Sequence, residues 1–174
     1  MIANYENRSY QGDLPLWAGT YRPLNNLPHW HREAEVIYLR EGQASIGVNG
    51  EVFQAGPGAL FFCGGGDIHF TASQKDASLS MLIFDPALAR PILQGYRLAS
   101  PRCTCGIDFA SYFHKISRLL LERGRFYEQE AAAHLTLFVA ELFRLEACGP
   151  AAGEKDRYLL GQYQALLDYI DGNY

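Results

Sequence analysis

The chain has 174 residues, of which 48% are hydrophobic and 20% are charged, and its formal net charge at pH 7 is -4. This length is sufficient for one domain with a sizeable buried core, and the composition is that of a globular protein. The negative charge argues against a nucleic-acid-binding surface on these residues, because such surfaces are basic.

The N-terminal sequence does not have the layout of a targeting segment. Its first residues, MIANYENRSYQGD, are polar and lack the basic start and apolar run of a signal peptide. No stretch approaches the roughly 18 consecutive apolar residues of a membrane-spanning helix. The cysteines have no zinc-finger spacing, and Cys103 and Cys105 are too close in sequence to pair well with each other. We therefore predict free thiols, a cytoplasmic location and no membrane contact.

The first hundred residues have the pattern of a β-rich unit. Short β-type runs are separated by turn residues, and the pair Asn49-Gly50 suits a two-residue hairpin because both positions require positive φ. Many short strands with tight turns predict a sandwich or a barrel. The predicted strands are Leu16–Tyr21, Glu35–Arg40, Ala44–Val48, Val52–Gln54, Ala59–Phe62, Ile68–Thr71 and Leu79–Phe84.

The pattern changes near residue 100, beyond which apolar residues recur at helical spacing. One helix is predicted from Phe109 to a stop at Gly124, and a longer one from Glu128 to Ala147. A third amphipathic stretch, between residues 159 and 170, follows a glycine- and proline-rich break. The predicted fold class is α+β, with residues 1–100 forming a β-rich unit and residues 101–174 forming a helical segment.

The most specific feature is a group of residues that can ligate a metal. His29 and His31 are two residues apart, so their side chains share one face of an extended chain, and Glu35 keeps to that face at an even spacing. His69, which follows the run Gly64-Gly-Gly66, can bring a third imidazole from a neighbouring strand. Three imidazoles and one carboxylate suit zinc, iron, nickel, copper or manganese.

Each of these residues also has a purely structural interpretation. A single histidine on a strand is usually a packed or solvated imidazole, and Glu35 can pair with Arg32 or Arg40. The joint pattern favours a site, because four ligand-type residues at strand-compatible spacing seldom coincide by accident. A metal bound here would need neutral imidazoles, so we expect weaker binding at acid pH.

The two parts of this group resemble the two motifs of the cupin family. The run His29-x-His31-x3-Glu35-x6-Gly42 is similar to the first motif, and Gly58-x5-Gly64-x-Gly66-x2-His69 is similar to the second, with Gly64 in a place where that motif normally has proline. The resemblance covers roughly residues 15–85 and implies a cupin barrel, which is a double-stranded β-helix or jelly roll. It does not imply one activity, because cupins host many.

A cupin followed by helices resembles the first half of AraC-type bacterial transcription regulators. In these regulators an effector-binding cupin precedes two or three helices that pair two subunits, and a C-terminal unit with two helix-turn-helix motifs follows. The last residues, 166–174, are similar to the opening of the first DNA-binding helix. The resemblance implies an effector-sensing and dimerising domain that is not an enzyme, and that reaches DNA only through a C-terminal domain missing from this chain.

The long predicted helix favours a homodimer through the C-terminal helices. Beside its main apolar stripe it carries Ala131, Ala132, Leu137 and Ala140. A helix that is apolar over a wide arc must be buried on both sides, which suits a dimer interface backed by the barrel. The alternative, in which the helices only cover the barrel, stays open.

The resemblance also implies a small-molecule effector inside the barrel. The candidate residues are polar or aromatic and are expected to face inward: Trp17, Tyr21, Arg22, His29, His31, Glu35, Tyr38 and His69. For the aromatic residues, packing in the barrel core is the competing interpretation, and for Arg22 the alternative is an outward orientation. An effector can switch the protein only if it binds one arrangement better than the other.

Two further alternatives stay open. The four ligand-type residues either hold one divalent transition metal (Zn, Ni, Fe or Mn) or, as in regulators that keep part of the histidine pattern without a known metal, hydrogen-bond to the effector. The competing function is a small metal-dependent cupin enzyme of the dioxygenase or sugar-isomerase type, and a third is a dimerisation module without a ligand. No nucleophile–base arrangement stands out in the sequence.

Overall fold

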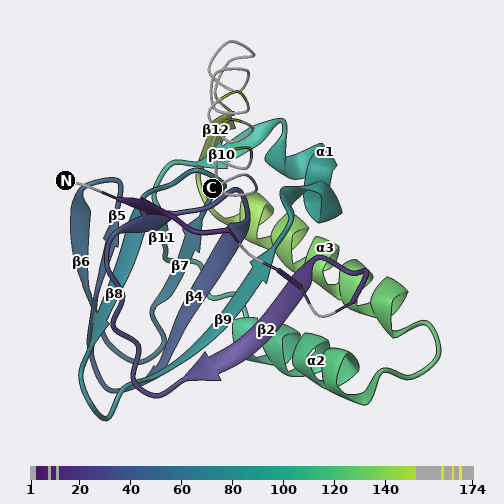
Figure 1. Ribbon diagram of the computed structural model, residues 1–174, viewed down its shortest axis with the longest axis horizontal. Helices are drawn as coiled ribbons and strands as arrows, with labels where there is room; N and C mark the ends of the chain where they lie inside the picture. The colour runs from purple at the N-terminus through teal and green to yellow at the C-terminus, as the bar shows by residue number, and fades with distance from the viewer. Residues whose placement is uncertain are drawn as a thin grey trace.

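The computed structural model describes residues 3–7, 9–10 and 12–151, together with the single positions 162, 166 and 169. Two five-stranded sheets face each other, and two long helices pack on the outer side of one sheet (Figure 1). The strands are β1 (Asn4–Tyr5), β2 (Leu16–Tyr21), β3 (His29–Trp30), β4 (Ala34–Glu41), β5 (Ala44–Val48), β6 (Glu51–Ala55), β7 (Leu60–Cys63), β8 (His69–Ser73), β9 (Ser78–Phe84), β10 (Tyr96–Leu98), β11 (Arg102–Cys103) and β12 (Cys148–Pro150). The helices are the 3-10 turn η1 (Pro86–Ala89), α1 (Arg90–Leu93), α2 (Phe109–Glu122) and α3 (Tyr127–Leu145).

The order of strands brings distant parts of the chain together. One sheet has the order β1-β3-β8-β5-β6, the other has the order β11-β7-β4-β9-β2, and β10 pairs separately with β12. In the first sheet His29 of β3 lies directly opposite His69 of β8. In the second, Glu35 of β4 lies between Cys63 and Ile83. The pairing register thus places three ligand-type residues near the same end of the sandwich.

Odd- and even-numbered residues of strand β4 face two different apolar cores. Ile37 and Leu39 belong to the core between the two sheets, whereas Val36 belongs to the core between the second sheet and the helices. Because side chains alternate along a strand, Glu35 faces the other sheet and Tyr38 faces the helices.

The two long helices cover the outer face of the second sheet. Helix α2 begins after Asp108, whose carboxylate accepts a hydrogen bond from the backbone N–H of Ser111 at 3.1 Å and so caps the first turn. Ile116 of α2 and Phe138 of α3 are fully buried in the core that the helices share with this sheet. The helices are also linked by the Tyr112 hydroxyl, which donates to Glu141 at 2.7 Å.

Most of the predicted elements are confirmed. The seven predicted strands correspond to β2 and β4–β9, and Asn49 and Gly50 have φ values of 50° and 90°, as the hairpin requires. The first predicted helix ends at Glu122, and the left-handed residue after it is Arg123 rather than the expected Gly124. The strands of two or three residues and the short η1–α1 segment were not predicted, because so few residues show no periodicity. The third amphipathic stretch lies outside the described residues, apart from positions 162, 166 and 169.

Two further predictions are tested by the described part of the chain. All four cysteines are free, as expected from their spacing. Among residues 3–151, as far as they are described, no helix has the length and apolar character needed to cross a membrane.

The turn between β7 and β8 fixes where β8 begins. Gly66 has a φ of 88°, and its N–H donates to the carbonyl oxygen of His31 at 2.8 Å. A Cβ added at Gly65 would lie 2.3 Å from the carbonyl oxygen of Arg32, so the two backbone segments are in direct contact. Asp67 accepts a hydrogen bond from the N–H of Gly64 at 2.7 Å, which a proline at that position could not donate.

Candidate metal centre

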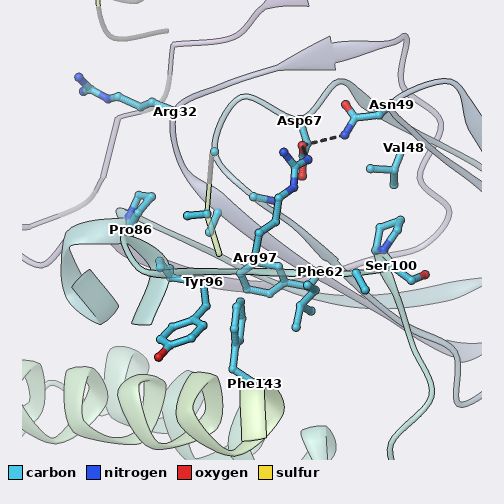
Figure 2. Close-up of a pocket in the computed structure, with 18 of the residues that line it drawn as sticks. Arg32, Val48, Asn49, Phe62, Asp67, Pro86, Tyr96, Arg97, Ser100 and Phe143 are labelled. Carbon is cyan, nitrogen blue, oxygen red and sulfur yellow. Dashed lines mark hydrogen bonds and ion pairs between the residues drawn. The ribbon is translucent and has the colours of Figure 1, made fainter. Parts of the chain in front are cut away.

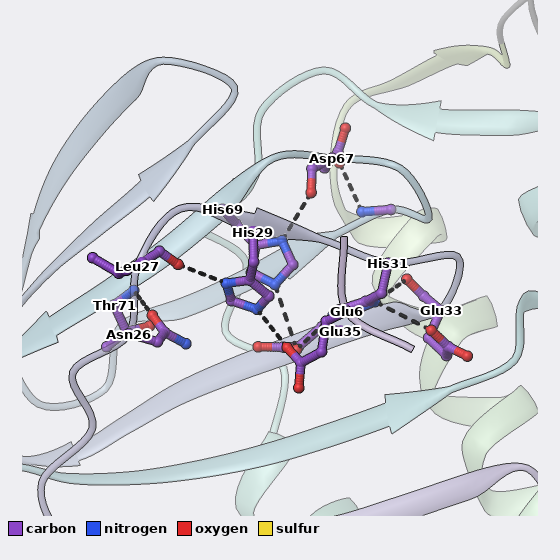
Figure 3. A network of polar contacts seen from close by, with 11 residues as sticks. Glu6, Asn26, Leu27, His29, His31, Glu33, Glu35, Asp67, His69 and Thr71 are labelled. Atoms are coloured by element: carbon purple, nitrogen blue, oxygen red, sulfur yellow. Dashed lines mark hydrogen bonds and ion pairs between the residues drawn. The ribbon is translucent and has the colours of Figure 1, made fainter. Parts of the chain in front are cut away.

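Four buried side chains converge between the two sheets (Figure 3). His29 comes from β3, His31 from the position directly after β3, Glu35 from β4 and His69 from the first position of β8. One ligand atom from each residue lies within 4.8 Å of the other three, and none of these residues is more than 5% exposed. We call these four residues the His/Glu cluster. The structure thus brings together the four residues that the sequence singled out.

Backbone carbonyl groups fix the orientation of all three imidazoles. The Nδ1 atoms of the three histidines lie 2.9, 3.2 and 2.8 Å from the carbonyl oxygens of Leu27, Glu33 and Asp67, respectively. A carbonyl oxygen can only accept, so in each contact Nδ1 carries the proton and donates. A neutral imidazole with its proton on Nδ1 has its lone pair on Nε2, which is the atom directed toward Glu35 or its neighbours. This is the arrangement found around histidine ligands of metals.

The centre of the cluster has more acceptors than donors. The Glu35 Oε2 atom lies 3.2 Å from Nε2 of His31 and 3.5 Å from Nε2 of His69. The Nε2 atoms of His29 and His69 are buried and have no hydrogen-bond partner within the described residues. Lone pairs that face a carboxylate repel it unless a proton or a cation lies between them. The donor set and its buried Nε2 atoms therefore fit a divalent transition metal.

Burial and mutual contact shift the proton affinities of the cluster. Burial disfavours ionised Glu35, but its contacts with the imidazoles of His31 and His69 outweigh this effect, so the pKa of Glu35 lies well below its ordinary value. Burial and then the neighbouring His69 lower the pKa of His29. Burial also acts against a charged His69, but its contact with Glu35 prevails and raises the pKa of His69. The cluster thus holds a carboxylate anion beside imidazoles of unequal basicity.

Two carboxylates beside the cluster were not anticipated from the sequence. The side chain of Glu33 is 2% exposed, and its Oε2 lies 3.5 Å from Nδ1 of His31, on the side of the ring away from the cluster centre. Glu6 follows β1, and its Oε2 lies 3.4 Å from Nε2 of His29. Glu33 lies two residues after His31 and two before Glu35, so its position in the sequence could have indicated that it lies close to the cluster. No local pattern points to Glu6, because only the pairing of β1 with β3 brings it there.

The remaining effector candidates divide into two groups. Trp17 and Tyr21 pack against the core between the sheets, with ring centroids 5.7 Å apart. The expected inward orientation of Tyr38 is wrong: its ring contacts Phe109 of α2 at a centroid distance of 5.3 Å, because it stands at an odd spacing from Glu35. Arg22, for which an outward orientation was the open alternative, is exposed directly after β2.

Two sheets that hold this cluster between them, with helices behind one sheet, form a cupin jelly roll followed by C-terminal helices, as the sequence predicted. The chain belongs to the family of AraC-like ligand-binding domains, which matches residues 25–139.

Solved structures of low similarity include several cupins. An RmlC-like cupin from Shewanella frigidimarina is 21% identical, with a TM-score of 0.38; the match covers 47% of this chain and 75% of the Shewanella chain. KdgF from Halomonas sp. is 20% identical, with coverages of 42% and 73% and a TM-score of 0.38. Oxalate decarboxylase from Bacillus subtilis, which has Mn(II) centres, is 28% identical, with coverages of 41% and 21% and a TM-score of 0.34. No curated protein sequence matches the chain.

The His/Glu cluster predicts metal binding that weakens on acidification. Between pH 7.5 and 5.5 we expect the affinity for Zn(II), measured by competition with a chromogenic chelator, to fall by about tenfold or more. The sign follows from competition between protons and the metal. Glu35 stays ionised over this range because its pKa is lowered. The pKa of His69 is raised, so as the pH falls this imidazole takes up a proton at a higher pH than an ordinary imidazole does, and the proton displaces the metal.

Histidines outside the cluster provide the control for this experiment. His69→Gln removes one ligand and should lower the affinity at pH 7.5 by about tenfold or more. His114→Gln changes an exposed histidine of α2 and should leave the affinity unchanged. An affinity that is the same at both pH values, or equal losses in the two variants, would show that Zn(II) binds elsewhere.

Proposed function

We propose that this chain is the effector-sensing and dimerising domain of a cytoplasmic bacterial regulator of the AraC type. The observation that carries the proposal is the match to AraC-like ligand-binding domains, which extends over strands β3 to β9, α2 and most of α3. In this proposal residues 1–100 bind the effector, residues 101–174 pair two subunits, and a helix-turn-helix domain outside these residues contacts DNA. The negative charge of the chain is consistent with DNA being bound elsewhere.

The His/Glu cluster is the proposed effector site, with Trp17 and Tyr21 as neighbouring apolar surface. A divalent metal held by the four residues would supply a Lewis-acidic centre for an oxygen-bearing effector. The backbone carbonyls keep each Nε2 directed at the centre, so the imidazoles are preorganised for a metal or for the effector itself. Because Glu6 contacts His29 and β1 pairs with β3, a change at His29 reaches the N-terminal segment directly.

The outward side of α3 is the proposed dimer interface. Ala133, Leu137 and Ala140 follow one another at helical spacing on this side, and Leu137 is 58% exposed. Small residues beside a leucine let a second helix approach closely. Ala131, which was expected to widen the apolar arc, is instead fully buried in the core shared with the second sheet. Leu121, near the end of α2, is another exposed leucine of the helical segment, at 83% exposure.

A charge on this surface should disrupt the dimer. We expect the chain to sediment as a dimer, and Leu137→Glu to raise the dimer dissociation constant by about thirtyfold or more, because a carboxylate would be buried against the partner helix. Val52→Glu is a matched control, since Val52 is 55% exposed but lies on β6. Analytical ultracentrifugation measures both. A monomeric chain, or equal weakening by both substitutions, would contradict the proposed interface.

A metal-dependent cupin enzyme is the second candidate, because all four ligand positions are present and buried. The coding sequence beyond the codon for Tyr174 separates the two functions. A regulator requires about 100 further residues with two helix-turn-helix patterns. A stop codon directly after Tyr174 would overturn the regulator proposal and leave metal-dependent catalysis as the leading function.

A further inference from the structure

A second feature of the structure is a cavity that lies outside the sandwich of the two sheets. Its volume is about 580 Å³, and it lies between the β7–β8 turn, strand β10 and the C-terminal end of α3 (Figure 2). None of the four residues of the His/Glu cluster lines it. Small-molecule sites typically have volumes of roughly 300 to 1,000 Å³. The cavity therefore has the size of a ligand site and is separate from the cluster.

The floor of this cavity is apolar and firmly packed. Phe62 of β7 and Phe143 of α3 meet edge to face, with ring centroids 5.5 Å apart and planes at 84°. Both belong to the core between the second sheet and the helices, and Leu93 and Leu98 pack against the same core. A flat or branched apolar group would find a preformed surface here.

The carboxylate of Asp67, on one wall of the cavity, already accepts hydrogen bonds from three donors of the protein. The Oδ1 atom of Asp67 accepts hydrogen bonds from Asn49, at 2.8 Å, and from Nη2 of Arg97, while its Oδ2 accepts one from the N–H of Gly64 at 2.7 Å. Two of these three donors would remain if Arg97 turned toward a ligand. Asp67 is only 13% exposed, so it presents little acceptor surface to the cavity.

Arg97 is the group on this wall that can select a ligand. Its side chain is 57% exposed, and one guanidinium nitrogen, Nη2, donates a hydrogen bond to Asp67 (Figure 2). A guanidinium group has five N–H donors in a planar fork that matches a carboxylate. Arg32 and the acidic Glu51 of β6 line the cavity as well. The combination of an aromatic floor and an arginine at the wall suits a molecule with an apolar body and one carboxylate.

We infer that this cavity binds a small amphipathic carboxylate, with its aromatic or branched body on Phe62 and Phe143 and its carboxylate on Arg97. The biological role of this second site rests on the proposed function in effector sensing, but the binding itself does not. The site also adjoins the cluster, because the carbonyl oxygen of Asp67 accepts the hydrogen bond from Nδ1 of His69 at 2.8 Å. An occupant would thus contact the β7–β8 turn, α3 and Ala151, which follows β12.

Phenylacetate and 3-phenylpropionate are suitable probes, and phenylacetamide is a neutral control of nearly the same shape. Binding to the 174-residue chain is measured by calorimetry and by backbone amide NMR shifts. We expect the carboxylates to bind about tenfold or more tightly than the amide, because only they can pair with the guanidinium. The largest shifts should fall on residues of the β7–β8 turn and of strand β10.

Arg97→Gln should weaken phenylacetate binding by about tenfold or more, and Arg97→Lys should retain part of it, since lysine keeps the charge but not the fork. Arg118→Gln is the matched control, because Arg118 of α2 is also 57% exposed and also pairs with a carboxylate, that of Glu122. Its effect should stay within about twofold.

The inference would be overturned by equal affinity for acid and amide, by equal affinity of the Arg97→Gln and Arg118→Gln variants, or by no binding of either carboxylate at about 10 mM. Shifts confined to Trp17, Tyr21 and the cluster would also overturn it, because the ligand would then lie inside the barrel. Each of these results leaves the proposed function intact, since the coding sequence and the dimer interface are tested at other residues.

Discussion

The buried carboxylate of Glu35 is the constraint on which the site depends. An ionised carboxylate that is 1% exposed is costly unless opposite charge or hydrogen-bond donors surround it. The Nε2 atoms of His31 and His69 face this carboxylate at 3.2 and 3.5 Å, and a cation held between these atoms and the carboxylate would provide the opposite charge. Backbone carbonyl groups fix this orientation by accepting hydrogen bonds from the Nδ1 atoms. The electrostatic requirement of one residue thus fixes the orientation of several segments of the chain.

The β7–β8 turn connects this constraint to the rest of the molecule. It contacts the backbone of Arg32 through Gly65, holds its own shape through the bond from Gly64 to Asp67, and positions His69 through the carbonyl of Asp67. The same Asp67 forms one wall of the outer cavity. The turn therefore contacts both the His/Glu cluster and the outer cavity.

The sequence allowed prediction of those features that arise from local periodicity. Alternation along an extended chain placed His29, His31 and Glu35 on one face, and helical spacing located α2 and α3. The same alternation, counted from Glu35, would have placed Tyr38 on the opposite face. The outer cavity could not be predicted, because Phe62, Arg97 and Phe143 are brought together only by the pairing and packing of segments far apart in sequence. The approach of Glu6 to His29 has the same origin.

The metal content of the purified chain tests the central claim most directly, because the arrangement around Glu35 is explained by a cation at its centre. The protein should be purified without nickel resin and analysed by inductively coupled plasma mass spectrometry. We expect about one equivalent per chain of a single divalent transition metal, lost on His31→Gln substitution and retained on His114→Gln substitution. Less than about a tenth of an equivalent of any transition metal would contradict the claim, and would leave the three imidazoles as hydrogen-bonding groups for an effector.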